Sequence, residues 1–243
     1  MGAQWKQKWR ELNADRKGKM TNKLVKEIQV AARMGGPHPE FNARLAAAVE
    51  AARKQSVYRD TIERAIAKGA GTDAGGSTLE AVVFEGFAPH RVPVIVECLT
   101  DNNNRTSPEI RILFRQGSLG TPGSVAWMFD RVGLIEGWTA EATVDPETAA
   151  IEAGADDLEV LGIDEIEDLP HGAAAVRFFS ATTDLDAVSK ALRAAGWTLT
   201  TSELSYRPKS FPDLSEDERN EVTAFLRGLD EHGDVHRLHA AIR

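Results

Sequence analysis

The chain of 243 residues is longer than one average domain and leaves room for two or three small ones. Its hydrophobic fraction of 42%, charged fraction of 27% and formal net charge of −8 exclude the compositions of disordered and fibrous proteins. No apolar run approaches the roughly 18 residues of a membrane helix, and the N-terminus lacks the apolar stretch of a signal peptide. The composition therefore predicts a cytoplasmic globular protein with no membrane partner.

The net charge conceals a division of charge along the sequence. Residues 1–77 carry 15 Lys and Arg against 8 Asp and Glu, a formal +7, whereas the remaining residues carry 14 against 29, a formal −15. One interpretation is a solvated helical surface. The other is a basic module that faces a polyanion, because Lys and Arg gain affinity by displacing condensed counterions from phosphates.

Helical spacing dominates residues 1–77, for which we predict a small bundle of three helices. Between Lys19 and Arg33, apolar residues recur at helical spacing and a stripe of basic side chains lies roughly opposite them. This lysine stripe consists of Lys19, Lys23, Lys26 and Arg33. Gly35 predicts the end of this helix, Asn42 is the expected N-cap of the second, and the third stops at Gly69 before a flexible linker.

Basic and aromatic residues are interleaved in a mobile N-terminal arm that precedes the lysine stripe. Trp5 and Trp9 stand among five cations, which are Lys6, Lys8, Arg10, Arg16 and Lys17. Such interleaving suits stacking on unpaired bases, with cation–π help from Arg. The alternative interpretation is that one tryptophan anchors the arm to the bundle.

The pattern changes to an α+β one after residue 78. Three strands are expected, at residues 79–84, 92–99 and 124–129. Between the last two we predict a helix that opens with Ser107 as its cap and Pro108 in its first position. Cys98 is the only cysteine and lies within an apolar run, so we interpret it as a core residue rather than a nucleophile.

A polar run from Thr100 to Thr106 separates the second strand from this helix. Capping alone accounts for part of the run, because Asn and Asp side chains bond their own backbone in turns. The functional alternative is a loop that contacts an anion beside a helix N-terminus, through Asn102, Asn104 and Arg105. The glycine-rich residues 117–124 lack the GK[ST] ending of a P-loop and lie in helix-to-strand order, so we predict a rigid turn there.

A second α+β unit is predicted for residues 132–206, in the order β-α-β-β-α-β of a ferredoxin-like domain. Residues 136–168 contain 12 acidic residues and no Lys or Arg, which makes this unit a poor candidate for phosphate contact. A helix at residues 214–229 and a strand at 235–242 are expected to follow.

No motif for catalysis or metal binding is found. His232, His236 and His239 have nearly helical spacing, but a Gly-Asp pair interrupts the helix, and neither a Cys pair nor an HExxH pattern accompanies them. We therefore predict no metal, no cofactor and no catalytic residue.

Two alternatives outside nucleic-acid binding stay open. The first is an enzyme whose site at a domain junction uses Asp101, Arg105 or His90. The second is a protein-interaction adaptor that works through the acidic unit. A screen for hydrolase and transferase activity tests the first, and pull-downs after nuclease treatment test the second.

Several runs of residues resemble the YebC family. They are KLVKEI at 23–28, VAAR at 30–33, TIERAI at 61–66, VECLTDN at 96–102, NRT at 104–106 and LGTPGSV at 119–125. The similarity covers most of the chain and weakens in the acidic unit and the C-terminal tail. Three departures from the family pattern indicate a divergent paralogue. They are the opening at residues 2–9, Asn103 where the family commonly has a basic residue, and residues 88–91 where it has a Gly-rich turn.

This resemblance implies an α+β fold of three domains, the third inserted into the second. The domains would be a helical bundle at residues 1–77, an α+β domain at 78–131 plus 207–243, and a ferredoxin-like domain at 132–206. It also implies a non-enzymatic regulator of gene expression. Members of the family are described as transcriptional regulators that bind DNA. Others, including the mitochondrial translational activator of cytochrome c oxidase, act on translation, with relief of ribosomes stalled at proline-rich stretches proposed for bacteria.

The residue pattern and the resemblance together favour a protein that binds nucleic acid, either DNA or, alternatively, ribosomal RNA. The expected contacts come from the arm, the lysine stripe and the polar loop. They are Lys6, Lys8, Arg10, Arg16, Lys17, Lys19, Lys23, Lys26, Arg33, Asn102, Asn104 and Arg105. The sequence leaves the oligomeric state open, with a monomer as one possibility.

Overall fold

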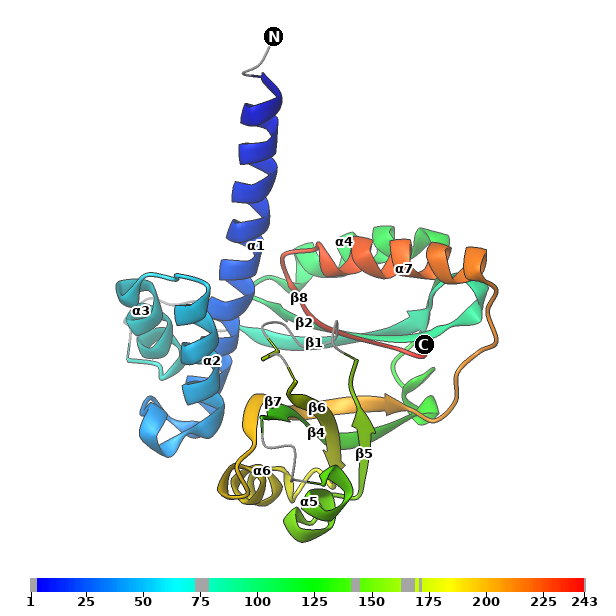
Figure 1. Ribbon diagram of the computed structural model, residues 1–243. Helices are drawn as coiled ribbons and strands as arrows, with labels where there is room; N and C mark the ends of the chain where they lie inside the picture. Colours follow the sequence, from blue (N-terminus) through cyan, green and yellow to red (C-terminus); the bar gives the residue numbers. More distant parts are fainter. Residues whose placement is uncertain (1–3, 73–78, 141–144, 163–168, 171, 243) are drawn as a thin grey trace. The chain divides into compact units, whose positions relative to one another are not determined.

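The computed structural model describes residues 4–72, 79–140, 145–162, 169–170 and 172–242; of residues 4–17 and 43 it describes the backbone alone (Figure 1). The chain divides into two compact units. One consists of Met1–Met128 with Ser210–Arg243, and the other of Phe129–Lys209. The expected fold class is confirmed, because helices at the N-terminus precede two antiparallel sheets.

The first unit begins with a bundle of three α-helices and a short 3-10 helix. They are α1 (Gln4–Gly35), η1 (Pro39–Phe41), α2 (Ala43–Lys54) and α3 (Arg59–Gly69). The helix expected from Lys19 begins at Gln4 instead, because residues 4–17 are rich in strong helix formers and contain neither Gly nor Pro. Asn42 caps α2 as predicted, since its side chain accepts a hydrogen bond from the Leu45 N–H at 3.0 Å.

The bundle core is small and consists mainly of aliphatic side chains. Fully or almost fully buried residues from all three helices form it, and they are Ile28, Ala31, Ala32, Leu45, Ala48, Val49, Ala52, Ile62 and Ala65. The apolar side of α1 is therefore used inside the bundle, while Lys23 and Lys26 contact the rest of the first unit.

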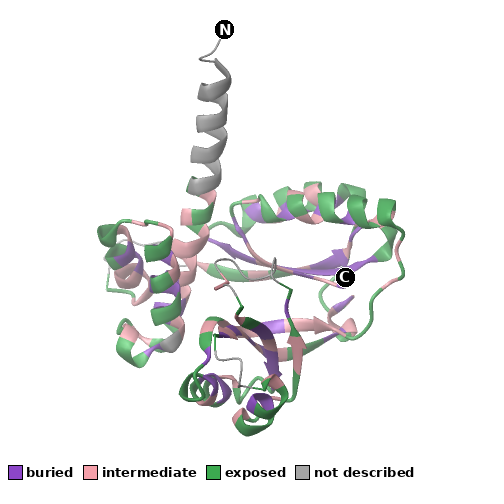
Figure 2. Ribbon diagram, in the orientation of Figure 1, coloured by how far each residue is buried: buried purple, intermediate pink, exposed green. Residues whose placement is uncertain are grey.

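The first sheet also belongs to this unit. Its strands are β1 (Glu80–Phe87), β2 (Pro93–Thr100), β3 (Ser118–Leu119) and β8 (Val235–Ala240), in the order β3-β1-β2-β8. The helices α4 (Asn103–Leu113) and α7 (Glu216–Asp230) cover one face, and the core between helices and sheet is buried (Figure 2). Because β8 pairs with β2, the C-terminal segment completes a sheet that starts before the second unit, which is therefore an insertion.

Two local predictions in this region are wrong. Residues 124–129 do not form a strand; Ala126–Met128 form a 3-10 helix instead. The helix expected to open with Ser107 as its cap begins five residues earlier, because the side chain of Asn102 accepts from the Arg105 N–H and caps α4. Pro108 therefore lies inside the helix and cannot donate to the Asn104 carbonyl.

A buried carboxylate explains why the segment after the glycine-rich turn is not a strand. The side chain of Glu85 on β1 accepts from the backbone N–H groups of Gly123 (2.6 Å), Val125 (2.9 Å) and Ala126 (2.8 Å). Glu85 is only 8% exposed, and burial alone would raise its pKa. The three N–H groups outweigh burial and lower the pKa, so the carboxylate stays ionised and fixes the turn.

We expect Glu85→Gln to destabilise the fold by about 1–3 kcal/mol, because an amide NH₂ would face N–H donors that need an acceptor. Thermal unfolding measures the change. Glu80→Gln is the matched control, since Glu80 is exposed on the same strand and should shift stability by less than about 0.5 kcal/mol. Equal losses for the two variants would contradict the role assigned to Glu85.

The β1–β2 hairpin contains a strained turn. His90 (φ 58°) and Arg91 (φ 59°) both lie in the left-handed region that favours glycine. The resemblance places a Gly-rich turn here, which agrees with this backbone requirement. The His90 ring lies 3.3 Å from a Glu218 carboxylate oxygen and 2.8 Å from one of Glu221, both on α7, and these contacts hold the turn.

The second unit has the strand order of a ferredoxin-like domain. Its elements are β4 (Phe129–Thr139), α5 (Pro146–Ala153), β5 (Asp157–Val160), β6 (Ala174–Ser180), α6 (Leu185–Ala194) and β7 (Thr198–Pro208). The sheet order is β5-β6-β4-β7, with both helices packed on one face. Phe178 and Trp197 meet edge to face in this core, with ring centroids 4.9 Å apart.

Among the described residues, no helix is both long and apolar enough to cross a membrane.

Candidate nucleic-acid interface

Lys26, which the sequence places on the lysine stripe, is enclosed by acceptors. Its ammonium group donates to the carbonyls of Leu99 (2.8 Å) and Gly233 (2.9 Å) and to Asp234 Oδ1 (2.7 Å). Only 18% of its side chain is exposed. Because an ammonium has three N–H donors, all of them are used. Lys26 therefore connects α1 to the end of β2 and to the turn before β8.

The other members of the lysine stripe also have partners in the chain. Lys23 Nζ lies 2.6 Å from Asp230 Oδ1 and donates to the Asp230 carbonyl at the end of α7, where the helix dipole favours a cation. Arg33 donates to a backbone carbonyl at 2.9 Å, and Lys19 has an interaction as well. Lys23 and Lys26 are therefore neutralised by carboxylates of this chain. Contact of these residues with nucleic acid stays a prediction.

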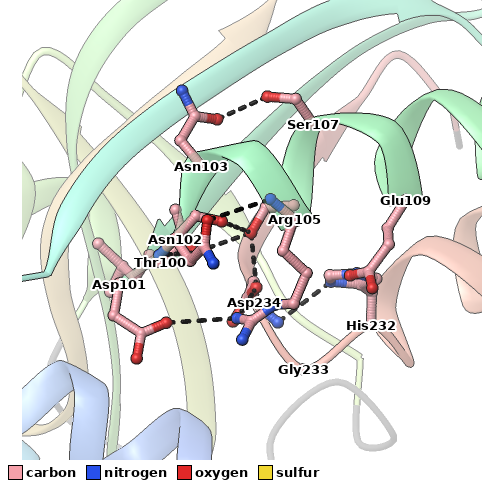
Figure 3. A network of polar contacts seen from close by, with 12 residues as sticks. Thr100, Asp101, Asn102, Asn103, Arg105, Ser107, Glu109, His232, Gly233 and Asp234 are labelled. Carbon is pink, nitrogen blue, oxygen red and sulfur yellow. Dashed lines mark hydrogen bonds and ion pairs between the residues drawn. The ribbon is translucent and has the colours of Figure 1, made fainter.

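Asp234 accepts hydrogen bonds from two separate helices, α1 and α4, and Figure 3 shows its contact with Arg105 of α4. Besides Lys26, its carboxylate accepts from Arg105 Nη2 (2.8 Å) and Thr106 Oγ1 (2.7 Å), and the hydroxyl oxygens of Thr106 and Thr100 lie 2.7 Å apart. These five residues are called the Asp234 cluster below. Burial would raise the pKa of Asp234, but the hydrogen bonds from Lys26, Thr106 and Arg105 outweigh it and lower the pKa well below its ordinary value.

A second carboxylate connects α1 to β8. Glu27 Oε1 accepts from Arg44 Nε at 2.7 Å, while Glu27 Oε2 lies 2.6 Å from His236 Nε2 and 3.6 Å from Arg237 Nη2. Burial of Glu27 opposes its ionisation, but the bonds to His236 and Arg44 dominate and lower its pKa. The basic side of α1 is thus held on the α7–β8 segment through two carboxylates as well as through Lys23.

We expect the folded chain to lose stability as the pH falls below about 5. Asp234, Glu27 and Glu85 all have a lower pKa in the folded chain than their ordinary values of 3.8 and 4.5. Their stabilisation is therefore complete above the unfolded pKa values and is lost as the pH falls through the folded ones. Urea unfolding at a series of pH values measures this. A midpoint that stays constant down to about pH 3 would contradict it.

The polar loop is divided between structural and exposed residues. Asn102 caps α4, while Asn104 is exposed on its first turn. Arg105 is 48% exposed and binds Asp234 at 2.8 Å and Asp101 at 3.4 Å. The structure thus brings Arg105 and Lys26, both predicted site residues, to one carboxylate, which sequence reasoning missed because 129 residues separate Arg105 from Asp234.

The three C-terminal histidines do not converge, since each faces a different carboxylate. His236 pairs with Glu27, and His239 lies 3.5 Å from Glu97. His232 accepts the Asp234 N–H on Nδ1 (3.1 Å), so its proton is on Nε2, 2.9 Å from Glu109.

The ligand atoms of Glu109, His232 and Asp234 do lie within 4.8 Å of one another, close enough to hold a metal ion in principle. In this arrangement, however, His232 has no free lone pair, and Asp234 already accepts from Lys26, Arg105 and Thr106. Asp234 therefore already has two cationic partners, and His232 is hydrogen-bonded on both ring nitrogens.

The residues of the alternative enzyme site are separated. His90 lies in the turn before β2, and Asp101 and Arg105 follow its far end. At about 3.3 Å per residue, the eight residues of β2 place His90 roughly 26 Å from Asp101 and Arg105. Cys98 is a residue of β2 and is buried in the core between the sheet and its helices, where burial raises its pKa to about 12 and keeps it a thiol. These groups cannot act on one substrate bond.

The predicted contacts of the N-terminal arm lie outside the described side chains. The backbone of α1 includes their positions, which are Lys6, Lys8, Arg10, Arg16 and Lys17. Across its whole length α1 has 9 Lys and Arg against 3 Asp and Glu, so most of the basic excess of residues 1–77 belongs to this one helix.

Comparisons with known proteins cover almost the whole chain. The family models described as "TACO1/YebC protein N-terminal domain" and "TACO1/YebC second and third domain" match residues 3–72 and 79–242. A protein of Pseudomonas syringae pv. syringae (strain B728a) named "Probable transcriptional regulatory protein" is 50% identical over 243 residues, 100% of this chain and 99% of that protein.

Two further relatives extend this similarity. A protein of Bdellovibrio bacteriovorus with the same description is 48% identical over 244 residues, covering 100% of both chains. The crystal structure of a conserved hypothetical protein from Aquifex aeolicus has a TM-score of 0.78 and 36% identity, covering 93% of this chain and 90% of that one.

Proposed function

Because the chain belongs to the TACO1/YebC family, we propose that it is a cytoplasmic regulator of gene expression that binds nucleic acid and catalyses no reaction. The observation that carries this proposal is the concentration of charge in α1, with 9 basic and 3 acidic residues, in a chain whose net charge is −8. A basic helix of this kind gains affinity for phosphates through release of counterions.

The N-terminal half of α1 is the primary contact in this proposal. Lys23 and Lys26 are committed to Asp230 and Asp234, so their charges are compensated within the chain. In this proposal phosphate contact therefore depends on the residues upstream of the lysine stripe, which are Lys6, Lys8, Arg10, Arg16 and Lys17. Contacts of this type position a protein on nucleic acid without reading its sequence.

The N-terminus of α4 is a secondary contact. Asn102, Asn104 and Arg105 come together there, where the helix dipole favours an anion. The contribution of Arg105 is limited, because Asp234 and Asp101 compensate its charge.

DNA is the leading target, because the relatives in Pseudomonas and Bdellovibrio are named as transcriptional regulators. The alternative is ribosomal RNA, with a role in relieving stalls at proline-rich stretches. One feature of the bundle favours RNA: the aromatic rings of Phe41 and Tyr58 are exposed, and RNA offers unpaired bases on which rings can stack.

Crosslinking in cells, followed by sequencing of the bound DNA and RNA, tests the proposal. Enrichment of promoter DNA supports the transcriptional role, and enrichment of ribosomal RNA, together with sedimentation alongside ribosomes, supports the translational one. Recovery of neither nucleic acid above a tag-only control would reject nucleic-acid binding altogether.

A further inference from the structure

Two aromatic side chains of the helical bundle are almost fully exposed. Phe41 in η1 is 85% exposed and Tyr58, directly before α3, is 83% exposed. Neither ring is part of the bundle core. Phe41 has a T-shaped contact with the exposed His38, at 6.4 Å between ring centroids. Large exposed rings cost solvation free energy, so their position calls for a physical account.

An open hollow of about 300 Å³ lies in the surface of the same bundle. Its apolar lining comes from η1, α2, α3 and the turn between α2 and α3, and consists of Pro39, Val49, Val57, Ile62 and Ile66. Phe41 follows Pro39 in the same short helix, and Tyr58 stands between the lining residues Val57 and Arg59. The two rings therefore belong to the segments that border the hollow.

The polar part of the lining is cationic on balance. It consists of Arg53, Arg59 and Glu63. Arg59 and Glu63 pair at 2.7 Å on successive turns of α3, and 87% of the Arg59 side chain is exposed. Arg53 is exposed, and among the described residues no carboxylate pairs with it. A partner that brings negative charge to the rim is thus electrostatically matched to Arg53.

We infer that this surface, called the ring pocket below and defined by Phe41, Tyr58, Arg53 and Arg59, binds an unpaired nucleobase of single-stranded RNA. An unpaired base has an apolar face for Phe41 or Tyr58, a flat edge that fits the hollow, and a phosphate for Arg53. Stacking on aromatic rings with arginine assistance is the usual way in which proteins hold single strands. This inference rests on the RNA alternative of the proposed function, since it assigns the part of the same bundle that would contact RNA.

An apolar helix of a partner protein is the competing occupant. It would be held by hydrophobic area alone, for which leucine serves as well as phenylalanine. Stacking, in contrast, needs the flat π-face of a ring. The chemistry of a single substitution therefore separates the two occupants.

Binding of the full-length chain to a fluorescent oligouridylate tests the inference, with Phe41→Leu, Tyr58→Leu and the double variant as substitutions. Since both rings are exposed, the fold should be unaffected, which thermal unfolding verifies. We expect each loss of a ring to weaken binding about tenfold. Phe41→Tyr and Tyr58→Phe keep the rings and should bind like the unaltered chain. Ile151→Leu, an exposed position on α5, controls for a general surface effect.

Duplex RNA and single-stranded DNA of the same length are the comparison ligands. If the leucine variants lose affinity for oligouridylate but keep their affinity for duplex RNA, the ring pocket is supported. If the unaltered chain binds single-stranded DNA more weakly than oligouridylate, RNA is identified as the source of the base. Unchanged oligouridylate affinity in the double leucine variant overturns the inference. If that variant keeps full affinity while reversal of the α1 charges abolishes it, the ring pocket is rejected and the proposed function stands.

Discussion

Asp234→Ala is expected to destabilise the folded chain by about 3–5 kcal/mol. The substitution removes the acceptor of two cations and a hydroxyl at a side chain that is only 9% exposed. Lys26, itself largely buried, would keep its carbonyl contacts but lose its counter-charge, and a buried unpaired cation is costly. Chemical unfolding in urea, followed by far-UV circular dichroism, measures the loss.

Asp230→Ala is the matched control. Asp230 also pairs with a lysine of α1, at 2.6 Å, but 62% of its side chain is exposed. An exposed ion pair contributes at most about 1 kcal/mol, so the control should remain close to the unaltered chain. Similar losses for Asp230→Ala and Asp234→Ala would mean that burial of the carboxylate is not what stabilises the contact.

A double-mutant cycle separates the pair from the surrounding cluster. If Lys26 and Asp234 stabilise the fold through each other, Lys26→Ala with Asp234→Ala should cost clearly less than the two single losses added together. Additive losses would assign the stabilisation to Arg105 and Thr106 instead.

Local patterns were sufficient where a helix or strand depends on its own residues. Asn42 caps α2 because its side chain reaches an N–H three residues away, and the β-α-β-β-α-β order of the second unit follows from alternating periodicities. The prediction of a strand at 124–129 was wrong because the structure of this segment depends on a residue far away in the sequence. Its apolar residues are typical of a strand, but Glu85, about 40 positions earlier, binds its N–H groups.

The lysine stripe was correctly identified as one side of a helix, yet its environment was not. Helical spacing shows which side chains share a face, whereas the groups opposite that face can come from anywhere in the chain. Asp230 and Asp234 lie 207 and 208 positions from their lysines. The exposed rings of Phe41 and Tyr58 were missed likewise, because hydropathy predicts burial for aromatic residues and cannot identify the ones that stay outside the core.

Lys23 and Lys26 are neutralised within the chain, whereas the proposed phosphate contacts lie upstream of them on α1. Substitutions in the two groups should therefore affect stability and nucleic-acid affinity separately. We expect charge reversal of the upstream residues to lower nucleic-acid affinity at least about a thousandfold at low salt while leaving the thermal midpoint unchanged. The substitutions are Lys6→Glu, Lys8→Glu, Arg10→Glu, Arg16→Glu and Lys17→Glu. Because each phosphate contact contributes roughly 0.7–0.9 to the slope of log affinity against log salt, the slope should fall by about 4.

Lys26→Ala should show the reverse behaviour, a lower thermal midpoint with a smaller change in affinity, because its charge is already balanced by Asp234. Reversal of Lys190 and Arg193 on α6 controls for overall charge, since it makes the chain more acidic without touching α1. An upstream variant that binds DNA and RNA as tightly as the unaltered chain would remove α1 as the contact. A variant that loses both affinity and stability would show that upstream cations, too, serve the fold.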